Sequence, residues 1–386
     1  MLVLNNYAPD VRVHKEAKTM ASAGYEVTVF ALWQEGLPDT EIMEGYQLKR
    51  IHLKTRKWRN RLIAPLVKYL EFFFHVQSES KKHPADIYHA NEAITLPAAW
   101  LAASRNRAKL VYDSHELETD REFMASQLSR FYGLVWSLPE RALIRQADAV
   151  ITVSEGIAGE IARRYDIQKP LVVMNCPEKV HLFRTNRLRE ELGIPENMKI
   201  ALYQGGIAPE RGIEQFFDAV QRIPGLAGVA MGDGPLLSEL RSRLHSGEWE
   251  RVYLPGRVQA KELPSYTASA DLGIVLNQGK SLSYQYSLPN KLFENLQAGN
   301  PVIGSNLPEI ARIIREYQVG EVVDQTDPES IAAGLRRLLE DPAYYEQTRR
   351  NALRASETLN WEREGARLVE LYRCLGESPA KPEGSK

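Results

Sequence analysis

Short apolar runs rich in β-branched residues alternate with amphipathic helical stretches along nearly the whole chain, and this alternation most restricts the fold. Several runs are apolar without interruption, such as "LVVM" at 171–174 and "LGIVL" at 272–276. Strands of this kind are buried on both faces, which is typical of a parallel sheet covered by helices. The sequence therefore predicts an α/β fold.

The period of the apolar residues assigns the individual elements. Strands are expected at 1–4, 26–32, 47–53, 86–89, 109–113, 149–153, 171–174, 199–203, 228–232, 252–254, 271–276, 301–304 and 321–323. Helices are expected at 11–23, 96–103, 134–147, 155–165, 213–223, 289–298 and 362–375.

The alternation forms two series, because it loosens after the strand at 171–174 and restarts at 199. A chain of 386 residues is also too long for one ordinary core. The last helix can pack on either domain, including back on the first. The predicted parts are an N-terminal domain at 1–176, a linker at 177–196, a C-terminal domain at 197–361 and a disordered tail at 376–386.

The composition excludes several classes of protein. A net charge of −1 argues against a nucleic-acid partner. The two cysteines form neither a metal cluster nor a disulfide framework, which fits a reducing cytosol. The start of the chain has no cleavable signal-peptide pattern, and no apolar run approaches the roughly 18 residues of a membrane span. A cytoplasmic protein is therefore expected.

A glycine loop, "YQGGIAPERG" at 203–212, follows the first strand of the second series and opens a helix. Gly205 and Gly206 allow close backbone approach, and Arg211 sits where the helix begins. An anion bound there would meet free N–H groups, the helix dipole and a guanidinium. The alternative is an ordinary glycine turn with a solvated arginine.

The stretch "SLPNKLFENLQAGNPVI" at 287–303 predicts a short helix between Pro289 and Gly299. Lys291 and Glu294 lie on its polar side. The lysine suits a diphosphate, and the carboxylate, which only accepts hydrogen bonds, suits the vicinal hydroxyls of a ribose. The alternative is an exposed ion pair worth a few tenths of a kcal/mol.

Polar residues also follow strands of the first series. "VYDSHELETD" places His115 just past a strand, with Glu116 beside it, and "DIYHANEA" places His89 after another strand. Each histidine could equally be a hydrogen-bonded loop residue. Arg12, near the start of the first helix, could contact a ligand, or it could be only a solvated first-turn residue.

In order along the chain, the glycine loop is followed by "MGDGP", "LPGRV", "ASADLGIVL", "SLPNKLFENLQAGNPVI" and "DPESIAAGLRRLLEDP". In this order and at this spacing the motifs resemble those of the retaining GT-B glycosyltransferases of family 4, over nearly the whole chain. The resemblance implies an α/β fold of two Rossmann-like domains facing across a cleft. It also implies transfer of a sugar, with retention, from a nucleoside-diphosphate-sugar to a hydroxyl acceptor.

The resemblance also implies roles for residues. Arg211 and Lys291 would face the diphosphate, Glu294 the ribose, and the backbone at Arg257–Val258 the base. His115 would be the catalytic residue close to the transferring sugar, with Arg12, His89 and Glu116 in the vicinity of the sugar or acceptor. For Arg12, contact with the donor phosphate, contact with the acceptor and a solvated first-turn position stay equally open. The expected donor-binding set is Gly205, Gly206, Arg211, Arg257, Val258, Ser287, Asn290, Lys291 and Glu294.

Two departures from the family's pattern bear on the donor. Many members have two glutamates separated by seven residues, and Tyr286 stands where the first would face the sugar. Sugar contacts then fall to backbone amides or to neighbours such as Ser287. Gly206 stands where many members have an arginine. These departures keep two alternatives open: a nucleotide-sugar epimerase or hydrolase, and a non-catalytic GT-B scaffold.

No metal site is expected, because there is no His or Cys cluster and no Asp-x-Asp at a strand end. No cofactor is expected. The donor substrate is expected to be a sugar linked to UDP or GDP. The stretch at 54–75 has six Lys/Arg and a single acid, with several aromatic residues. It is expected either to lie on the inner face of a membrane, which would suit a lipid-linked acceptor in polysaccharide or glycolipid synthesis, or to be a solvated loop leading into a core helix.

Overall fold

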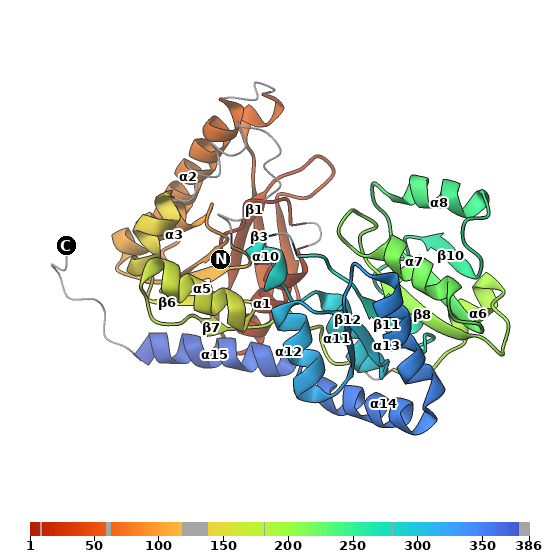
Figure 1. Ribbon diagram of the computed structural model, residues 1–386. Helices are drawn as coiled ribbons and strands as arrows, with labels where there is room; N and C mark the ends of the chain where they lie inside the picture. The colour runs from red at the N-terminus through yellow and green to blue at the C-terminus, as the bar shows by residue number, and fades with distance from the viewer. Residues whose placement is uncertain (8–9, 59–62, 118–137, 181, 280, 378–386) are drawn as a thin grey trace. The chain divides into compact units, whose positions relative to one another are not determined.

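The computed structural model describes residues 1–7, 10–58, 63–117, 138–180, 182–279 and 281–377, and the chain forms two compact units (Figure 1). Unit 1 comprises Met1–Met174 together with Glu364–Lys386, and unit 2 comprises Asn175–Arg363. Each unit has a mainly parallel sheet flanked by helices. The predicted α/β class with two Rossmann-like domains is confirmed.

The sheet of unit 1 is built around the first residues of the chain. Leu2 forms parallel bridges to Phe30 and to Ala90, and so joins a sheet of order β1-β3-β2 to one of order β4-β5-β6-β7. Only β2 runs antiparallel, against β3. The strands are β1 (Thr28–Leu32), β2 (Thr40–Met43), β3 (Tyr46–Ile51), β4 (Ile87–Asn91), β5 (Lys109–Ser114), β6 (Ala149–Thr152) and β7 (Leu171–Val172).

The helices of unit 1 follow the expected order, with one substantial addition at 64–82. Of the helix expected at 134–147, residues 134–137 lie outside the described residues, while 138–143 are helical and lead into a 3-10 turn. Strand β2 is the other element that the apolar pattern did not predict, because its four residues alternate between exposed and half-buried. The helices are α1 (Val11–Ser22), η1 (Lys54–Lys57), α2 (Ala64–Lys82), α3 (Leu96–Asn106), η3 (Ile144–Gln146), α5 (Glu155–Tyr165) and α15 (Trp361–Glu377).

Helix α15 closes unit 1 from the far end of the sequence, along β7 and α5 (Figure 1). Leu368 and Tyr372 are buried in one apolar cluster with Val111 of β5 and Ile151 of β6. The backbone N–H of Met174 donates to the carboxylate of Glu364 at 2.8 Å. The last helix therefore packs back on the N-terminal sheet, one of the two expected arrangements.

Unit 2 has a six-stranded parallel sheet of order β10-β9-β8-β11-β12-β13. All six strands match the predicted positions within a few residues. They are β8 (Lys199–Gln204), β9 (Leu226–Met231), β10 (Val252–Gly256), β11 (Leu272–Val275), β12 (Val302–Ser305) and β13 (Gly320–Val323).

The helices of unit 2 cover both faces of this sheet. Apolar side chains of α7 and α13 form one buried cluster with the sheet, while Leu188 of α6 and Tyr266 of α9 belong to another. The helices of unit 2 are α6 (Arg187–Leu192), α7 (Ile213–Gln221), α8 (Leu237–His245), α9 (Leu263–Thr267), α10 (Leu282–Gln285), α11 (Asn290–Ala298), α12 (Pro308–Tyr317), α13 (Pro328–Glu340) and α14 (Pro342–Ser356).

Residues 177–196, predicted as a linker, belong to unit 2 and contain α6. Leu188 is fully buried, and its backbone N–H donates to Ser269 Oγ at 3.2 Å. The division between the units falls at Met174–Asn175 rather than at 176–177. A single buried leucine in a short helix is too sparse a pattern to be recognised by periodicity. Of the predicted tail, 378–386 lies outside the described residues, and 376–377 end α15.

In the described part of the chain, no helix is both long enough and apolar enough to cross a membrane.

Close contact between α11 and the sheet depends on a glycine. A Cβ built on Gly273 of β11 would lie 2.2 Å from the side-chain carbon of Asn295 on α11. Asn295 is fully buried and donates to the backbone oxygen of Lys291 at 2.8 Å. The missing side chain therefore sets how closely the helix that carries Lys291 and Glu294 lies against β11.

We expect Gly273→Ala to lower the free energy of unfolding of unit 2 by about 1–3 kcal/mol, because the added methyl group overpacks the contact with Asn295. The matched control is Gly159→Ala, in the exposed middle of α5, where a built Cβ meets nothing within 4 Å. That change should stabilise unit 1 by about 0.5–1 kcal/mol. Urea unfolding, read from the transition of each unit, measures both. Equal effects of the two substitutions would contradict this account of the packing.

Candidate active site

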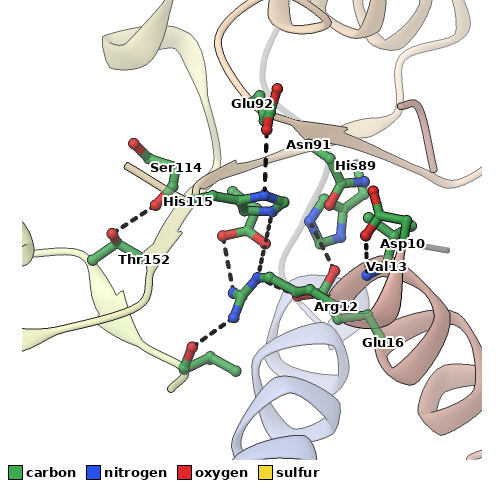
Figure 2. A network of polar contacts seen from close by, with 12 residues as sticks. Asp10, Arg12, Val13, Glu16, His89, Asn91, Glu92, Ser114, His115 and Thr152 are labelled. Carbon is green, nitrogen blue, oxygen red and sulfur yellow. Dashed lines mark hydrogen bonds and ion pairs between the residues drawn. The ribbon is translucent and has the colours of Figure 1, made fainter. Parts of the chain in front are cut away.

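The best-ordered polar cluster of unit 1 is centred on Arg12, in the first turn of α1 (Figure 2). Asp10 caps this helix by accepting the N–H of Val13. Arg12 is only 5% exposed, and its Nε and Nη2 donate to the two carboxylate oxygens of Asp113 at 2.8 and 3.0 Å. Its Nη1 donates to the backbone oxygen of Val173 at 2.9 Å. Arg12 is thus a buried clamp on Asp113 and not a solvated first-turn residue.

His115 is held at the end of β5 by the same carboxylate. Its Nε2 lies 2.9 Å from Asp113 Oδ2, and its Nδ1 lies 3.8 Å from a carboxylate oxygen of Glu92. The side chain is 17% exposed, so part of the ring remains accessible. When the ring is neutral, the Nε2 proton is donated to Asp113 and Nδ1 is left as an acceptor. The structure therefore gives His115 a fixed orientation.

The charges of this cluster shift the pKa values of its members. Burial raises the pKa of Asp113, but Arg12 and His115 outweigh burial and hold it well below its usual range. Burial alone would lower the pKa of His115, but the charge of Asp113 and the hydrogen bond to it outweigh burial and raise it. The pair therefore favours an ionised Asp113 beside a histidine that readily accepts a second proton.

A second layer lies beneath the clamp. Glu16 of α1 is fully buried, with Oε1 3.1 Å from Arg12 Nε, and burial raises its pKa to about 8 against the opposing charge of Arg12. His89 is 1% exposed, and its Nδ1 lies 2.6 Å from the hydroxyl of Tyr372 on α15. Burial lowers the pKa of His89 to about 3. His89 therefore lies inside the unit, not in a loop.

Glu16, His89 and Asp113 offer ligand atoms that all lie within 4.8 Å of one another. Arg12 already places a positive charge against both carboxylates of this group. We therefore interpret the group as a buried polar network around the ion pair between Arg12 and Asp113. Glu116, the remaining predicted residue of this unit, is exposed, and its backbone oxygen accepts from Ser114 Oγ at 3.0 Å.

In unit 2 the glycine loop lies where two strands end side by side. Gly205 has φ +130°, and its backbone N–H donates to Met231 O at 3.0 Å. A Cβ on Gly232 would lie 1.8 Å from the oxygen of Gly205, so the two loops touch. Gly206 is exposed, and its oxygen accepts from the hydroxyl of Tyr203 at 2.7 Å. Gly212, with φ +65°, then begins α7.

Lys291 is brought to this loop in the first turn of α11. It is 7% exposed, and its Nζ lies 3.7 Å from the centre of the Tyr203 ring. Burial holds its pKa well below the ordinary value; the charge of Arg211 acts in the same direction, and Glu294 opposes it. The guanidinium of Arg211 lies over the ring of Tyr284 at 5.4 Å. The charge of Arg211 thus acts on Lys291, and two cations arranged in this way can receive an anion.

Glu294 lies one turn further along α11, and a residue of the sheet fixes its side chain. It accepts a hydrogen bond from Gln204 Nε2, and Gln204 Oε1 accepts from Thr267 Oγ1 at 2.8 Å. Because Lys291 is buried against an aromatic ring, the two residues do not form the exposed surface pair that was the alternative. The glycine loop, Lys291 and Glu294 are thus brought together within one unit.

The other predicted donor residues are exposed or half-buried in unit 2. Arg257 is exposed, and Val258 is half-buried against an apolar cluster. Asn290 is the exposed first residue of α11, and Ser287 Oγ donates to Tyr284 O at 2.8 Å. Tyr286, where the family pattern has a glutamate, is half-buried at the end of α10.

Three residues of these clusters were passed over in the sequence. Gln204 directly follows the predicted strand 199–203, and the search for polar residues after strands could have found it. Tyr203 and Tyr284 carried no such signal, because an aromatic residue at a strand end or in a short helix is usually core. Their role depends on cations that other segments bring to them.

Comparison with known proteins agrees with this architecture. The family model "Glycosyltransferase Family 4" matches residues 10–177, and "Glycosyl transferases group 1" matches residues 184–355. A D-inositol 3-phosphate glycosyltransferase of Thermobispora bispora is 22% identical, over 94% of this chain and 89% of its own.

Solved structures show the same fold. A sucrose-phosphate synthase of Thermosynechococcus elongatus superposes with a TM-score of 0.80 at 20% identity, covering 97% of this chain and 98% of its own. HepE of Anabaena, in complex with UDP, gives 0.73 at 16% identity, covering 97% and 99%.

The two Rossmann-like units and the likeness to these structures define the GT-B fold. The two family models together cover most of the sequence, and the chain belongs to glycosyltransferase family 4. The family resemblance of the sequence motifs is confirmed, and the protein is an enzyme of the transferase class.

The raised pKa of Glu16 predicts how stability depends on pH. The folded chain keeps this proton up to a pH of about 8, whereas an unfolded glutamate releases it near its ordinary value of 4.5. The folded state therefore binds more protons between these values, and its free energy of unfolding should fall as pH rises through them. The raised pKa of His115 acts with the same sign, from its ordinary value of 6.5 upward.

In the Glu16→Gln variant this position no longer titrates. The free energy of unfolding of the variant should therefore fall less steeply between about pH 5 and 8. Urea unfolding at a series of pH values measures the slope. The control Glu26→Gln, at an exposed position of the same unit, should keep the wild-type slope. A Glu16→Gln slope identical to that of the wild type would show that Glu16 is ionised in the folded chain.

Proposed function

We propose that this glycosyltransferase moves a sugar from a nucleoside-diphosphate-sugar to a hydroxyl group of an acceptor, with retention and without a metal ion. The observation that carries the donor assignment is the buried Lys291 beside Arg211 and the glycine loop. In the transfer, the bond between the anomeric carbon and the diphosphate oxygen breaks. The acceptor oxygen forms the new glycosidic bond, and the acceptor's proton ends on the diphosphate or in solvent.

The leaving nucleoside diphosphate needs positive charge, and the residues of unit 2 can supply it. The charge of Arg211 lowers the pKa of Lys291, so a diphosphate between them would offset that repulsion and raise the pKa of Lys291. Exposed Gly206 and the start of α7 add backbone N–H groups and a helix dipole. These groups make a metal ion unnecessary for neutralising the leaving group.

The same site would also bind the nucleoside part of the donor. Glu294, oriented by Gln204, can accept two hydrogen bonds from ribose hydroxyls. The backbone of Arg257–Val258 would hold the base. The donor is a UDP- or GDP-linked sugar, and the UDP bound to the related HepE favours the former.

We further propose that His115 contacts the sugar during transfer. Its orientation by Asp113 and its raised pKa suit it to donate a hydrogen bond from Nδ1 to a sugar oxygen. With Tyr286 in place of a carboxylate, the remaining sugar contacts would come from Ser287, Asn290 and the backbone amides at the start of α11. The acceptor would be a saccharide or a lipid-linked saccharide, in polysaccharide or glycolipid synthesis. The enzyme would work in the cytoplasm, in peripheral contact with the inner face of the membrane.

A nucleotide titration tests the donor site. Glu294→Ala and Lys291→Ala should each weaken binding of the preferred nucleotide, UDP or GDP, by about 10- to 100-fold, because hydrogen bonds to charged groups contribute about 1.5–3 kcal/mol. Isothermal titration calorimetry measures the affinity after a thermal-shift screen has chosen between the nucleotides.

The control is Arg350→Ala, an exposed change on α14 of the same unit that should leave the affinity unchanged. The thermal midpoint of each variant without nucleotide shows whether it is folded. Wild-type affinity in folded Glu294→Ala and Lys291→Ala would overturn the donor-site assignment. Failure of the wild-type protein to bind either nucleotide would overturn the proposed function.

A further inference from the structure

Unit 1 contains a pocket that the reaction above does not use. Its volume is about 440 Å³, and it lies beyond the carboxyl ends of β1, β3 and β4. Ligands of parallel sheets bind at this edge. Its apolar lining residues are Leu4, Leu32, Leu53, Pro65, Tyr69 and Ile94.

Two basic residues complete the lining. Arg56 comes from η1 and Lys68 from the second turn of α2, and the described residues that line the pocket include no carboxylate. Lys68 is half-buried and has no ion-pair partner among the described residues. Arg56 donates to the backbone oxygen of Trp33. The pocket thus combines apolar walls with two positive charges, which fits a ligand that is both apolar and anionic.

The one acid of the segment 54–75 is engaged in holding this pocket together. The carboxylate of Glu71 accepts from the backbone N–H of Lys54 at 2.6 Å, and from the N–H and hydroxyl of Thr55 at 3.0 and 2.7 Å. These bonds fasten η1, which carries Arg56, to α2, which carries Lys68. Glu71 therefore has a structural role at the junction of η1 and α2, and the bases of the segment outnumber it.

The same helix has an apolar face that is exposed to solvent. Ile63, Leu66, Leu70 and Phe74 are 54, 46, 42 and 65% exposed, and their spacing of three and four residues places them on one side of α2. The opposite side is buried through residues such as Phe72. Trp58, in the same segment, is also 53% exposed. An apolar stripe of this length on a surface usually meets a partner or a membrane.

Charge indicates which of these it meets. Segment 54–75 has six Lys/Arg and one Glu, a net charge of +5, in a chain whose net charge is −1. Four of these bases lie on described parts of the segment: Lys54, Arg56 and Lys57 on η1, and Lys68 on α2. An apolar stripe that adjoins such positive charge is complementary to the interface of an anionic membrane. An acidic protein partner would match the charge, but the adjoining pocket, with its cations and apolar walls, is shaped for one anionic group with a hydrocarbon chain.

We propose that the pocket binds the phosphate and the first part of the chain of a membrane-held lipid phosphate, while the apolar face of α2 lies in the membrane interface. Arg56 and Lys68 contact the phosphate, and the apolar lining contacts the chain. The proposal rests on the proposed function and names its acceptor class: a saccharide carried on a lipid phosphate. Pocket residue Ile94 and Glu92, which faces His115, lie in the same connection between β4 and α3, so the saccharide of such a lipid would extend toward His115.

Vesicle sedimentation of the full-length protein tests the membrane part. The wild type should pellet with vesicles of phosphatidylcholine and phosphatidylglycerol, and much less with phosphatidylcholine alone. Replacing Leu66, Leu70 and Phe74 together by Ser should weaken binding about 100-fold or more, because three apolar side chains no longer enter the interface. The control is Ile42→Ser, which changes a side chain of the same unit that is 76% exposed. Equal binding of the triple variant and the wild type would overturn the proposal.

Binding of small probes tests the pocket and separates two sources of the anion. Farnesyl phosphate should bind more tightly than farnesol and than inorganic phosphate. Lys68→Ala should lower the affinity for farnesyl phosphate about 5-fold, because one basic residue near an anionic group contributes about 1 kcal/mol. Inorganic phosphate binding as tightly as farnesyl phosphate would show a site for soluble phosphate compounds and overturn the proposal. Equal affinity for farnesol would overturn the role of the cations.

These outcomes are separate from those of the nucleotide titration. The triple variant of α2 should bind UDP or GDP as the wild type does, because its changes lie in unit 1 and the donor residues in unit 2. If the wild type binds neither nucleotide but still binds farnesyl phosphate, the proposed function fails and the lipid site stands. If nucleotide binds and farnesyl phosphate does not, the lipid site fails alone.

Discussion

Unit 1 depends on the buried ion pair between Arg12 and Asp113. Removing one partner of such a pair typically costs about 3–5 kcal/mol, because the other charge is left buried without compensation. The pair joins the first turn of α1 to the end of β5, and the third nitrogen of Arg12 joins both to Val173 after β7. It also keeps Asp113 ionised, which in turn orients His115 and raises its pKa. The fold of the unit and the state of its candidate catalytic residue thus rest on one interaction.

The main buried charge of the candidate site in unit 2 has a different environment. There Lys291 is buried against an aromatic ring, and burial and the charge of Arg211 lower its pKa more than Glu294 raises it. The cost of this burial is tolerable because α11 is held close to the sheet, through Gly273 and Asn295, by packing that does not depend on charge. Unit 1 thus satisfies its charges internally, whereas unit 2 leaves a site that an anionic donor would complete.

Much of the fold could be predicted, because continuous apolar strands and amphipathic helices are local patterns. The strands of unit 2 were all anticipated, while β2 and α6 were not, since a half-exposed strand and a helix with one buried leucine leave weak patterns. Local patterns singled out some of the candidate site residues: His115 directly follows a strand, and Lys291 lies in the first turn of a helix. Their partners were not singled out, because Asp113 and Arg12 are 101 positions apart and Gln204 and Glu294 are 90 apart.

By itself the sequence determined the α/β class, the two series of strands and the order of motifs that marks the glycosyltransferase family, because each is written in short segments. Only the tertiary structure decided that Arg12 is a buried clamp, that His89 is bonded to Tyr372 of the last helix, and that Lys291 lies on Tyr203. It also decided which face of α2 is left exposed. The reason is physical: burial and pairing of a charge depend on what distant segments bring to it, and no local pattern records that.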